Sequence, residues 1–390
     1  MNRRKRIILR TCIFFLLCLA ASPAKSQWIG EPEIEAKLQK GIDYIYNISF
    51  DSARAQFKQV VKLKPDHPAG YFFLATVEWW NILIDINNTS RDDRFYSMLD
   101  RVVDVCDKRL DKDEHDVSAL FFKGGALGFQ GRLHGNREDW VKAANAGRQA
   151  LPIVREAYKL APENNDILLG IGIYNYYADI VPDKYPFVKP FMVFFPKGDK
   201  KKGIEQLRKA SEKATYANVE ATYFLLQLLQ NYEGRYEEAL ALALKLHNRY
   251  PRNPVFDKYV GRCYIAMNQT ANAEQTFNDI LQKVKNHQAG YADLIEREAH
   301  YYLGFNDFNN ANYEEALRHL YRCDELSRTL EKDEQTGFMV LANLRIGMVY
   351  DMQMKRQLAI DQYNKVLKMD DFQNAHEQAQ RYLKIPFGKS

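Results

Sequence analysis

Histidine is the residue of this chain with the widest catalytic and metal-binding repertoire, and eight histidines are spread along it. They are His67, His115, His134, His247, His287, His300, His319 and His376. No two of them lie within four positions of each other, so the sequence offers neither a metal-binding pair on one helical turn nor an HExxH motif. We therefore expect surface or helix-capping histidines, and we predict no metal and no cofactor.

The other candidate chemistry is a glycine-rich run, Gly124, Gly125 and Gly128. A dinucleotide site needs such glycines directly after a strand, and no strand is expected here. The sequence also contains no phosphate-binding P-loop and no nucleophile elbow. We therefore expect these glycines to serve helix packing, and Gly128, Gly131 and Gly135 to mark a flexible connection. We predict that the protein is not an enzyme.

A recurring spacing gives the framework in which all these residues must lie. Gly41, Tyr44, Ala53 and Phe57 define it. The same offsets return as Gly261, Tyr264, Ala273 and Phe277, as Gly304, Ala316 and Leu320, and as Gly347, Tyr350, Ala359 and Tyr363, while Gly234, Tyr236, Ala239 and Pro251 keep the second half. A repeat of about 34 residues with small residues at fixed places is typical of stacked helical hairpins.

This pattern resembles the tetratricopeptide repeat (TPR), a helix-turn-helix unit. The resemblance implies an all-α, right-handed superhelical solenoid of about eight TPR-like helical hairpins over residues 27–390. The regular repeats are expected near 34–67, 220–253, 254–287, 297–330 and 340–373, with irregular hairpins over 68–219. The middle of the chain is also similar to tetratricopeptide-39-type proteins, through Gly170, Gly172 and Asn175 and through Gly198-Asp199-Lys200.

Proteins of this kind hold other molecules on the inner face, which the first helix of each hairpin lines. Aromatic residues recur at the corresponding positions of this chain, and only the sixth repeat places basic residues there. The candidate binding residues are Phe72, Trp79, Phe121, Phe224, Lys258, Arg262, Tyr301, Phe305 and Phe308. Because no lysine–asparagine pair occurs at these positions, the carboxylate clamp of chaperone-binding TPR domains is not supported.

A proline-rich insert at residues 181–198 interrupts the fourth hairpin. Its four prolines prevent a continuous helix, and its aromatic residues are too apolar for an ordinary exposed loop. The aromatic residues are Tyr185, Phe187, Phe191, Phe194 and Phe195. Two alternatives are open: a plug that fills the solenoid groove, or a loop that docks to a partner or a membrane surface.

The N-terminus has the pattern of a secretory signal peptide, residues 1–26. A basic segment precedes a short apolar run, and Ala24-Lys25-Ser26 offers a cleavage site. Residues 1–26 contain six of the 55 basic residues and none of the 50 acidic ones, so the mature chain has a net charge of −1. A nucleic-acid partner therefore loses support. An uncleaved membrane anchor is the competing interpretation of this segment.

We thus expect an exported protein of the bacterial periplasm or cell envelope. The main hypothesis is a non-enzymatic scaffold or adaptor that binds a protein or peptide partner on the concave surface. The alternative is a carrier of an apolar, lipid-like small ligand in an aromatic groove, and the same aromatic residues allow a peripheral membrane contact.

The targeting hypothesis predicts cleavage after Ser26, which gives a mature chain that starts at Gln27. N-terminal sequencing of the exported protein measures this directly. An intact Met1 on that protein would contradict cleavage and would favour the membrane anchor instead.

Overall fold

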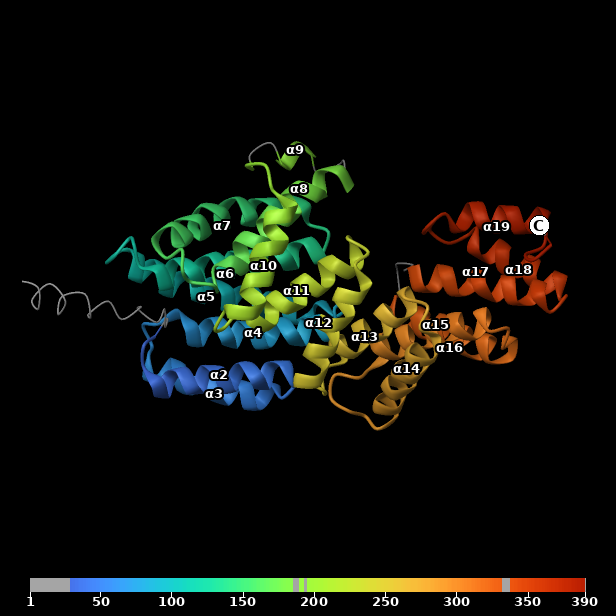
Figure 1. The fold of residues 1–390 in the computed structure, drawn as a ribbon, viewed down its shortest axis with the longest axis horizontal. Helices are drawn as coiled ribbons and strands as arrows, with labels where there is room; N and C mark the ends of the chain where they lie inside the picture. Colours follow the sequence, from blue (N-terminus) through green and yellow to red (C-terminus); the bar gives the residue numbers. More distant parts are fainter. Residues whose placement is uncertain (1–28, 185–188, 193–194, 332–336, 390) are drawn as a thin grey trace, which may run out of the picture.

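The computed structural model describes residues 29–184, 189–192, 195–331 and 337–389. These residues form helices joined by short turns, with no strand among them, and successive helices pair into eight antiparallel hairpins (Figure 1). The pairs are α2 (Pro32–Tyr46) with α3 (Phe50–Leu63), α4 (Pro68–Ile84) with α5 (Asp92–Leu110), α6 (Val117–Asn136) with α7 (Trp140–Leu160), α8 (Leu168–Lys184) with α10 (Lys200–Lys213), α11 (Asn218–Asn231) with α12 (Tyr236–Arg249), α13 (Pro254–Ala266) with α14 (Thr270–Lys285), α15 (Asp293–Asn309) with α16 (Tyr313–Leu330), and α17 (Gly337–Met352) with α18 (Arg356–Val366). The predicted all-α solenoid of about eight hairpins is confirmed.

Three shorter elements complete the described fold. The 3-10 helix η1 (Thr89–Arg91) leads into α5, and α9 (Lys189–Met192) lies between α8 and α10. The last helix, α19 (Ala375–Lys384), packs on α18 and covers the apolar side of the final hairpin through Ala379 and Tyr382. None of the helices in the described ranges has the length and hydropathy that a membrane crossing requires.

The turns inside several hairpins share one backbone geometry. Ile48, Asn268, Ala311 and Met354 each occupy the middle of a three-residue turn with a φ between 55° and 59°. The amide of the following residue bonds back into the first helix, as in Ser49 N–H to the Tyr44 carbonyl at 2.9 Å. This left-handed turn closes the end of the first helix and reverses the chain within three residues, so the two helices lie antiparallel.

The two helices of a regular hairpin approach closely where one of them has no side chain. A Cβ added to Gly41 would overlap the ring of Phe57, and one added to Gly347 would overlap the ring of Tyr363. The alanine of the second helix, such as Ala53, is fully buried at the same crossing. The repeat spacing therefore encodes the distance between the paired helices.

The hydrophobic core follows the stacking of the hairpins. Side chains from α2 to α6, from α8 and from α10 to α13 form one continuous cluster, which includes the fully buried Trp79 and Trp80. Helix α7 packs in a separate cluster with α6 and α8. Smaller clusters join α14 with α15, α16 with α17, and α18 with α19. Each hairpin thus completes its core with the next one, as expected for a solenoid.

Two segments differ from the sequence-based expectation. The glycines expected to mark a flexible connection, Gly128, Gly131 and Gly135, lie inside helix α6. Their φ angles are helical, because packing against α7 favours a regular helix over the intrinsic freedom of glycine. Helix α8 also continues to Lys184, with Pro182 in its last turn, where a missing N–H disturbs only the end of the helix.

Two histidines that are far apart in the sequence meet in the seventh hairpin. His300 of α15 and His319 of α16 are buried, and their Nδ1 atoms lie 2.7 Å apart. One ring must donate and the other accept, so the two rings are not both protonated. Burial is the main cause that lowers the pKa of His300 to about 3 and the pKa of His319 to about 4. The positive charge of Arg318 lowers both pKa values further. The nearby carboxylates are those of Glu296, Asp307 and Glu315. The expectation of surface or capping positions is wrong for this pair.

The helix crossing gives a stability prediction. Replacing the fully buried Ala239 of α12 by Arg should destabilise the protein by roughly 3 kcal/mol or more, because the larger side chain overfills the crossing and buries a charge. The matched control is Ala241→Arg on the exposed face of the same helix, which should change stability by about 0.5 kcal/mol or less. Equal urea-unfolding midpoints for the two variants would contradict the crossing.

The histidine pair gives a pH prediction. Because both pKa values are lowered in the folded protein, only the unfolded chain binds these protons as the pH falls below about 6.5. Each histidine should therefore remove roughly 1.4 kcal/mol of stability per pH unit between about pH 6 and pH 4. Urea unfolding at about pH 7 and at about pH 5 measures this loss of unfolding free energy. The loss should be smaller in the double variant H300Q/H319Q. If the variant loses as much stability as the wild type, the histidine pair is not the cause.

Candidate functional site

A cavity of about 680 Å³ lies on the inner face of the second to fifth hairpins. The first helices of these hairpins, α4, α6, α8 and α11, line most of it, together with α7 and with Tyr46 at the end of α2. Its aromatic lining residues are Tyr46, Phe72, Phe73, Phe121, Phe129, Tyr174, Tyr177, Tyr216, Phe224 and Tyr232. The side chains of the described chain do not fill this space.

Small residues on two helices create the space. Gly124, Gly125, Gly128 and Gly131 of α6 line the cavity, as do Gly147 and three alanines of α7. A Cβ added to Gly128 would have no neighbour within 4 Å, so the helix backbone there borders open space. The glycine run therefore shapes a wall of the cavity and is not a nucleotide-binding loop.

Arg132 of α6 is the cation of the cavity wall. Its guanidinium lies between two rings, with its Cζ atom 4.5 Å from the ring centre of Trp79 and 4.4 Å from that of Phe224. These two ring contacts restrict the movement of the guanidinium. Its Nη1 atom is buried, and the described residues provide no hydrogen-bond partner for it.

Glu220 of α11 faces Arg132 across the cavity wall. Its Oε1 atom accepts hydrogen bonds from Trp80 Nε1 at 2.8 Å and from the Tyr46 hydroxyl at 3.3 Å. Its Oε2 atom lies 3.8 Å from Arg132 Nη1, beyond hydrogen-bonding distance, and has no partner among the described residues. Burial raises the pKa of Glu220, and Arg132 and the two hydrogen bonds oppose that shift.

The arrangement suits binding more than catalysis. Besides this pair, the charged side chain in the lining is Asp166, whose Oδ1 accepts the backbone amides of Tyr216 and Ala217 at 2.7 and 2.8 Å. Asp166 is therefore engaged in holding the start of α11. An aromatic cavity with a few fixed polar groups is the usual form of a ligand site.

The predicted binding residues fall into separate groups. Phe72, Phe121 and Phe224 line the cavity together. Trp79 is fully buried behind Arg132 and supports it without lining the space.

The remaining predicted residues lie in later hairpins and contact other partners. Lys258 and Arg262 both pair with the buried Glu298 of α15, which links the sixth and seventh hairpins. The rings of Tyr301 and Phe305 hold Arg345 of α17. Phe308 packs against Tyr313 and Phe387. These residues connect neighbouring hairpins and do not extend the cavity.

The proline-rich insert is described only in part. Tyr185, Phe187 and Phe194 lie outside the described residues, and Phe191 belongs to α9. The ring of Phe195 lies 3.7 Å from the position of a Cβ on Gly147, and the Tyr174 hydroxyl donates to the Pro196 carbonyl. The end of the insert is thus attached to α7 and α8 beside the cavity.

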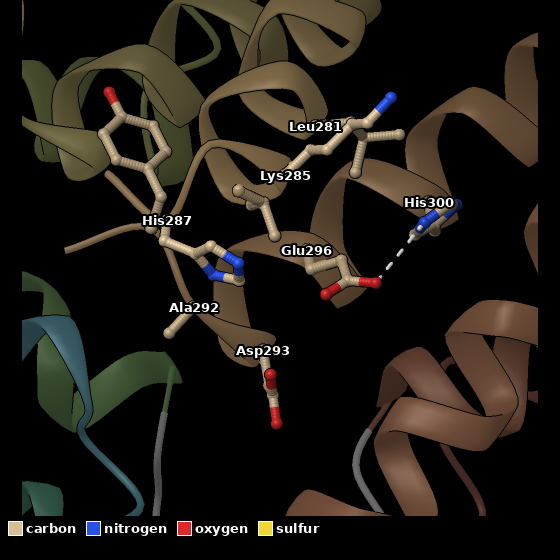
Figure 2. A pocket seen from close by; sticks show the side chains of 9 residues that line it. Leu281, Lys285, His287, Ala292, Asp293, Glu296 and His300 are labelled. Atoms are coloured by element: carbon tan, nitrogen blue, oxygen red, sulfur yellow. Dashed lines mark ion pairs between the residues drawn. The ribbon is translucent and has the colours of Figure 1, made fainter. Parts of the chain in front are cut away.

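A second depression, of about 590 Å³, lies between α14 and α15 (Figure 2). Glu296 is turned toward His300, with 3.8 Å between Oε1 and Nε2, while Lys285 points away from both. Glu296 also accepts from Arg322, and His300 bonds to His319, so the polar groups satisfy one another. Among the described residues no group of three His, Cys, Asp or Glu side chains is placed to hold a metal ion.

The sequence analysis did not identify Arg132, Glu220 and Tyr177 as site residues. Two signals were available: Arg132 shares a helical face with Gly124, Gly125 and Gly128, and Glu220 is the one charged residue of α11. Neither signal shows that the two side chains meet, because 88 positions separate them and only the stacking of the hairpins brings them together.

Comparison with solved structures finds chains of low overall similarity. A human IFIT1 dimer with PPP-AAAA matches with a TM-score of 0.44 and 15% identity, over 90% of this chain and 84% of that one. The C-terminal part of a TPR repeat-containing protein from Cytophaga hutchinsonii matches with a TM-score of 0.35 and 15% identity, over 76% and 97%. At such TM-scores neither protein indicates a role for this chain. The search of curated proteins finds no match.

The family comparison is more specific. Residues 231–298 match the model of the tetratricopeptide repeat. This segment contains α12, α13 and α14, where Ala239, Gly261, Ala273 and Phe277 stand at the helix crossings. The same crossing recurs outside the match, at Gly41 with Phe57 and at Gly347 with Tyr363. The chain thus contains tetratricopeptide repeats, and the family match itself covers residues 231–298.

Proposed function

We propose that this protein is a non-enzymatic scaffold that holds a partner protein on its concave surface. The cavity carries this proposal: four consecutive hairpins turn their first helices toward a space of about 680 Å³ that the described side chains leave open. TPR solenoids generally use this inner surface for protein interaction. Aromatic rings at such a surface favour contact with apolar side chains of a partner.

We also propose that the protein acts in the periplasm or at the cell envelope. The basic and apolar N-terminal segment supports this location, and the near-neutral mature chain fits a partner that is not a nucleic acid. The non-enzymatic role rests on the cavity wall, where Glu220 and Arg132 face each other and the described lining contains no serine, cysteine, lysine or histidine.

A position-specific crosslink tests the scaffold. A photoreactive phenylalanine at Phe121, in the cavity wall, should crosslink to a partner protein in the native cell, because a bound partner must pass within a few ångströms of it. The matched control is the same residue at Trp140, an exposed aromatic position at the start of α7 that is outside the lining. The expected result is one distinct adduct from Phe121 and none of that mass from Trp140. Equal adduct patterns at both positions would contradict binding at the cavity.

A carrier of an apolar small ligand is the second candidate. The cavity volume favours it, because drug-sized ligands occupy pockets of roughly 300–1,000 Å³ lined by apolar and aromatic side chains. Solvent extraction of the purified protein, followed by mass spectrometry, should then release one compound in about equimolar amount. An empty extract from protein that still forms the Phe121 crosslink would exclude the carrier and keep the scaffold.

A further inference from the structure

The strongest unexplained feature of the molecule is a buried carboxylate oxygen that faces the cavity. Glu220 is 7% exposed, and its two hydrogen bonds, from Trp80 and Tyr46, both go to Oε1. Its Oε2 atom lacks a partner in the described part of the chain. Buried polar atoms are nearly always hydrogen-bonded, so this oxygen indicates a missing donor in the cavity.

A second unpartnered atom lies beside it. Arg132 Nη1 is a donor, buried and unsatisfied, 3.8 Å from Glu220 Oε2. The rings of Trp79 and Phe224 hold the guanidinium, so a small rotation of Arg132 to reach Glu220 would disturb both stacks. The cavity therefore presents one donor and one acceptor at fixed positions.

The spacing of the two atoms selects the group that fits between them. A single oxygen can lie within hydrogen-bonding distance of both, accepting from Arg132 and donating to Glu220. A hydroxyl does this. A carboxylate would be repelled by the negative charge of Glu220, and an ammonium would be repelled by the positive charge of Arg132. The pair is neutral as a whole, and Asp166 is engaged by two backbone amides, so a charged ligand would leave a charge unpaired.

The rest of the space is apolar. The rings of Phe72, Phe121 and Tyr177 line the cavity around the polar pair, and the backbone of α6 at Gly128 borders it. We propose that the cavity binds a neutral small molecule with an apolar, ring-sized body and one hydroxyl, which bridges Arg132 Nη1 and Glu220 Oε2. This assignment rests on the second function proposed above and needs no protein partner.

Three neutral probes of similar size test the assignment: naphthalene, 2-naphthol and 2-methoxynaphthalene. The first has no polar atom, the second both donates and accepts, and the third only accepts. In isothermal titration calorimetry with the purified protein, 2-naphthol should bind at least about tenfold more tightly than either of the others, because only it satisfies both buried atoms.

The variant E220Q should change this order. Its amide oxygen can keep the bonds from Trp80 and Tyr46, which turns the amide nitrogen, a donor, toward the cavity. The cavity wall then presents two donors, which an ether oxygen can satisfy. The affinity of 2-methoxynaphthalene relative to that of 2-naphthol should therefore be about tenfold higher in E220Q than in the wild type. An unchanged order of affinities in E220Q would overturn the assignment of the hydroxyl to Glu220.

Two leucine substitutions show whether the probes bind in the cavity. Gly128 and Gly135 both lie in α6, and a Cβ on either has no neighbour within 4 Å, but only Gly128 lines the cavity. Gly128→Leu should abolish binding of all three probes without lowering the melting temperature, whereas Gly135→Leu should leave binding unchanged. Equal effects of the two substitutions would overturn the site.

The remaining outcomes are also decisive. Equal affinity of the wild type for all three probes would mean that water alone bridges Arg132 and Glu220, and would overturn the proposal. Absence of binding by every probe would overturn it as well. Neither result affects the Phe121 crosslink, so the scaffold stands or fails separately.

Discussion

The regular hairpins depend on a close crossing between their two helices, where a glycine of one helix faces a ring or a leucine of the other. Gly41 with Phe57 and Gly347 with Tyr363 show the same contact at opposite ends of the chain. The crossing fixes the distance and the angle within a hairpin, and the left-handed residue of the turn fixes the reversal. Stacking of equal units then places all first helices on one inner face, which is where the cavity lies.

The cavity arises where the hairpins depart from the regular repeat. Helices α6 and α7 contain glycines and alanines that line the cavity in addition to those at the helix crossing. Gly128, for example, borders open space and contacts no partner side chain. The same region holds the chain's buried Arg132–Glu220 pair, set among aromatic rings. A buried pair of this kind is costly to keep if it serves stability alone, which agrees with a binding role.

The fold was predictable because it follows from local spacing. Glycine, alanine and aromatic residues at constant offsets predict where the two helices of a hairpin cross. Pro254 after Asn253 predicts the start of a helix. The site was predictable only in part. Phe72, Phe121 and Phe224 follow from the register of the first helices, but the register equally includes Tyr301 and Phe305, which hold Arg345. Contacts between hairpins decide which aromatic side chains line the cavity and which ones are covered by a neighbouring hairpin. A sequence pattern within one hairpin does not predict these contacts.

The central claim is that the inner face of the second to fifth hairpins encloses a site for another molecule and is not merely a part of the core. A crystal structure of the protein purified from its native cell, without added ligand, tests this most directly. The account predicts electron density for a bound organic group or partner side chain in the cavity, within hydrogen-bonding distance of Arg132 and Glu220. Direct contact between these two side chains, with Phe72 and Tyr177 closed over an empty space, would contradict it.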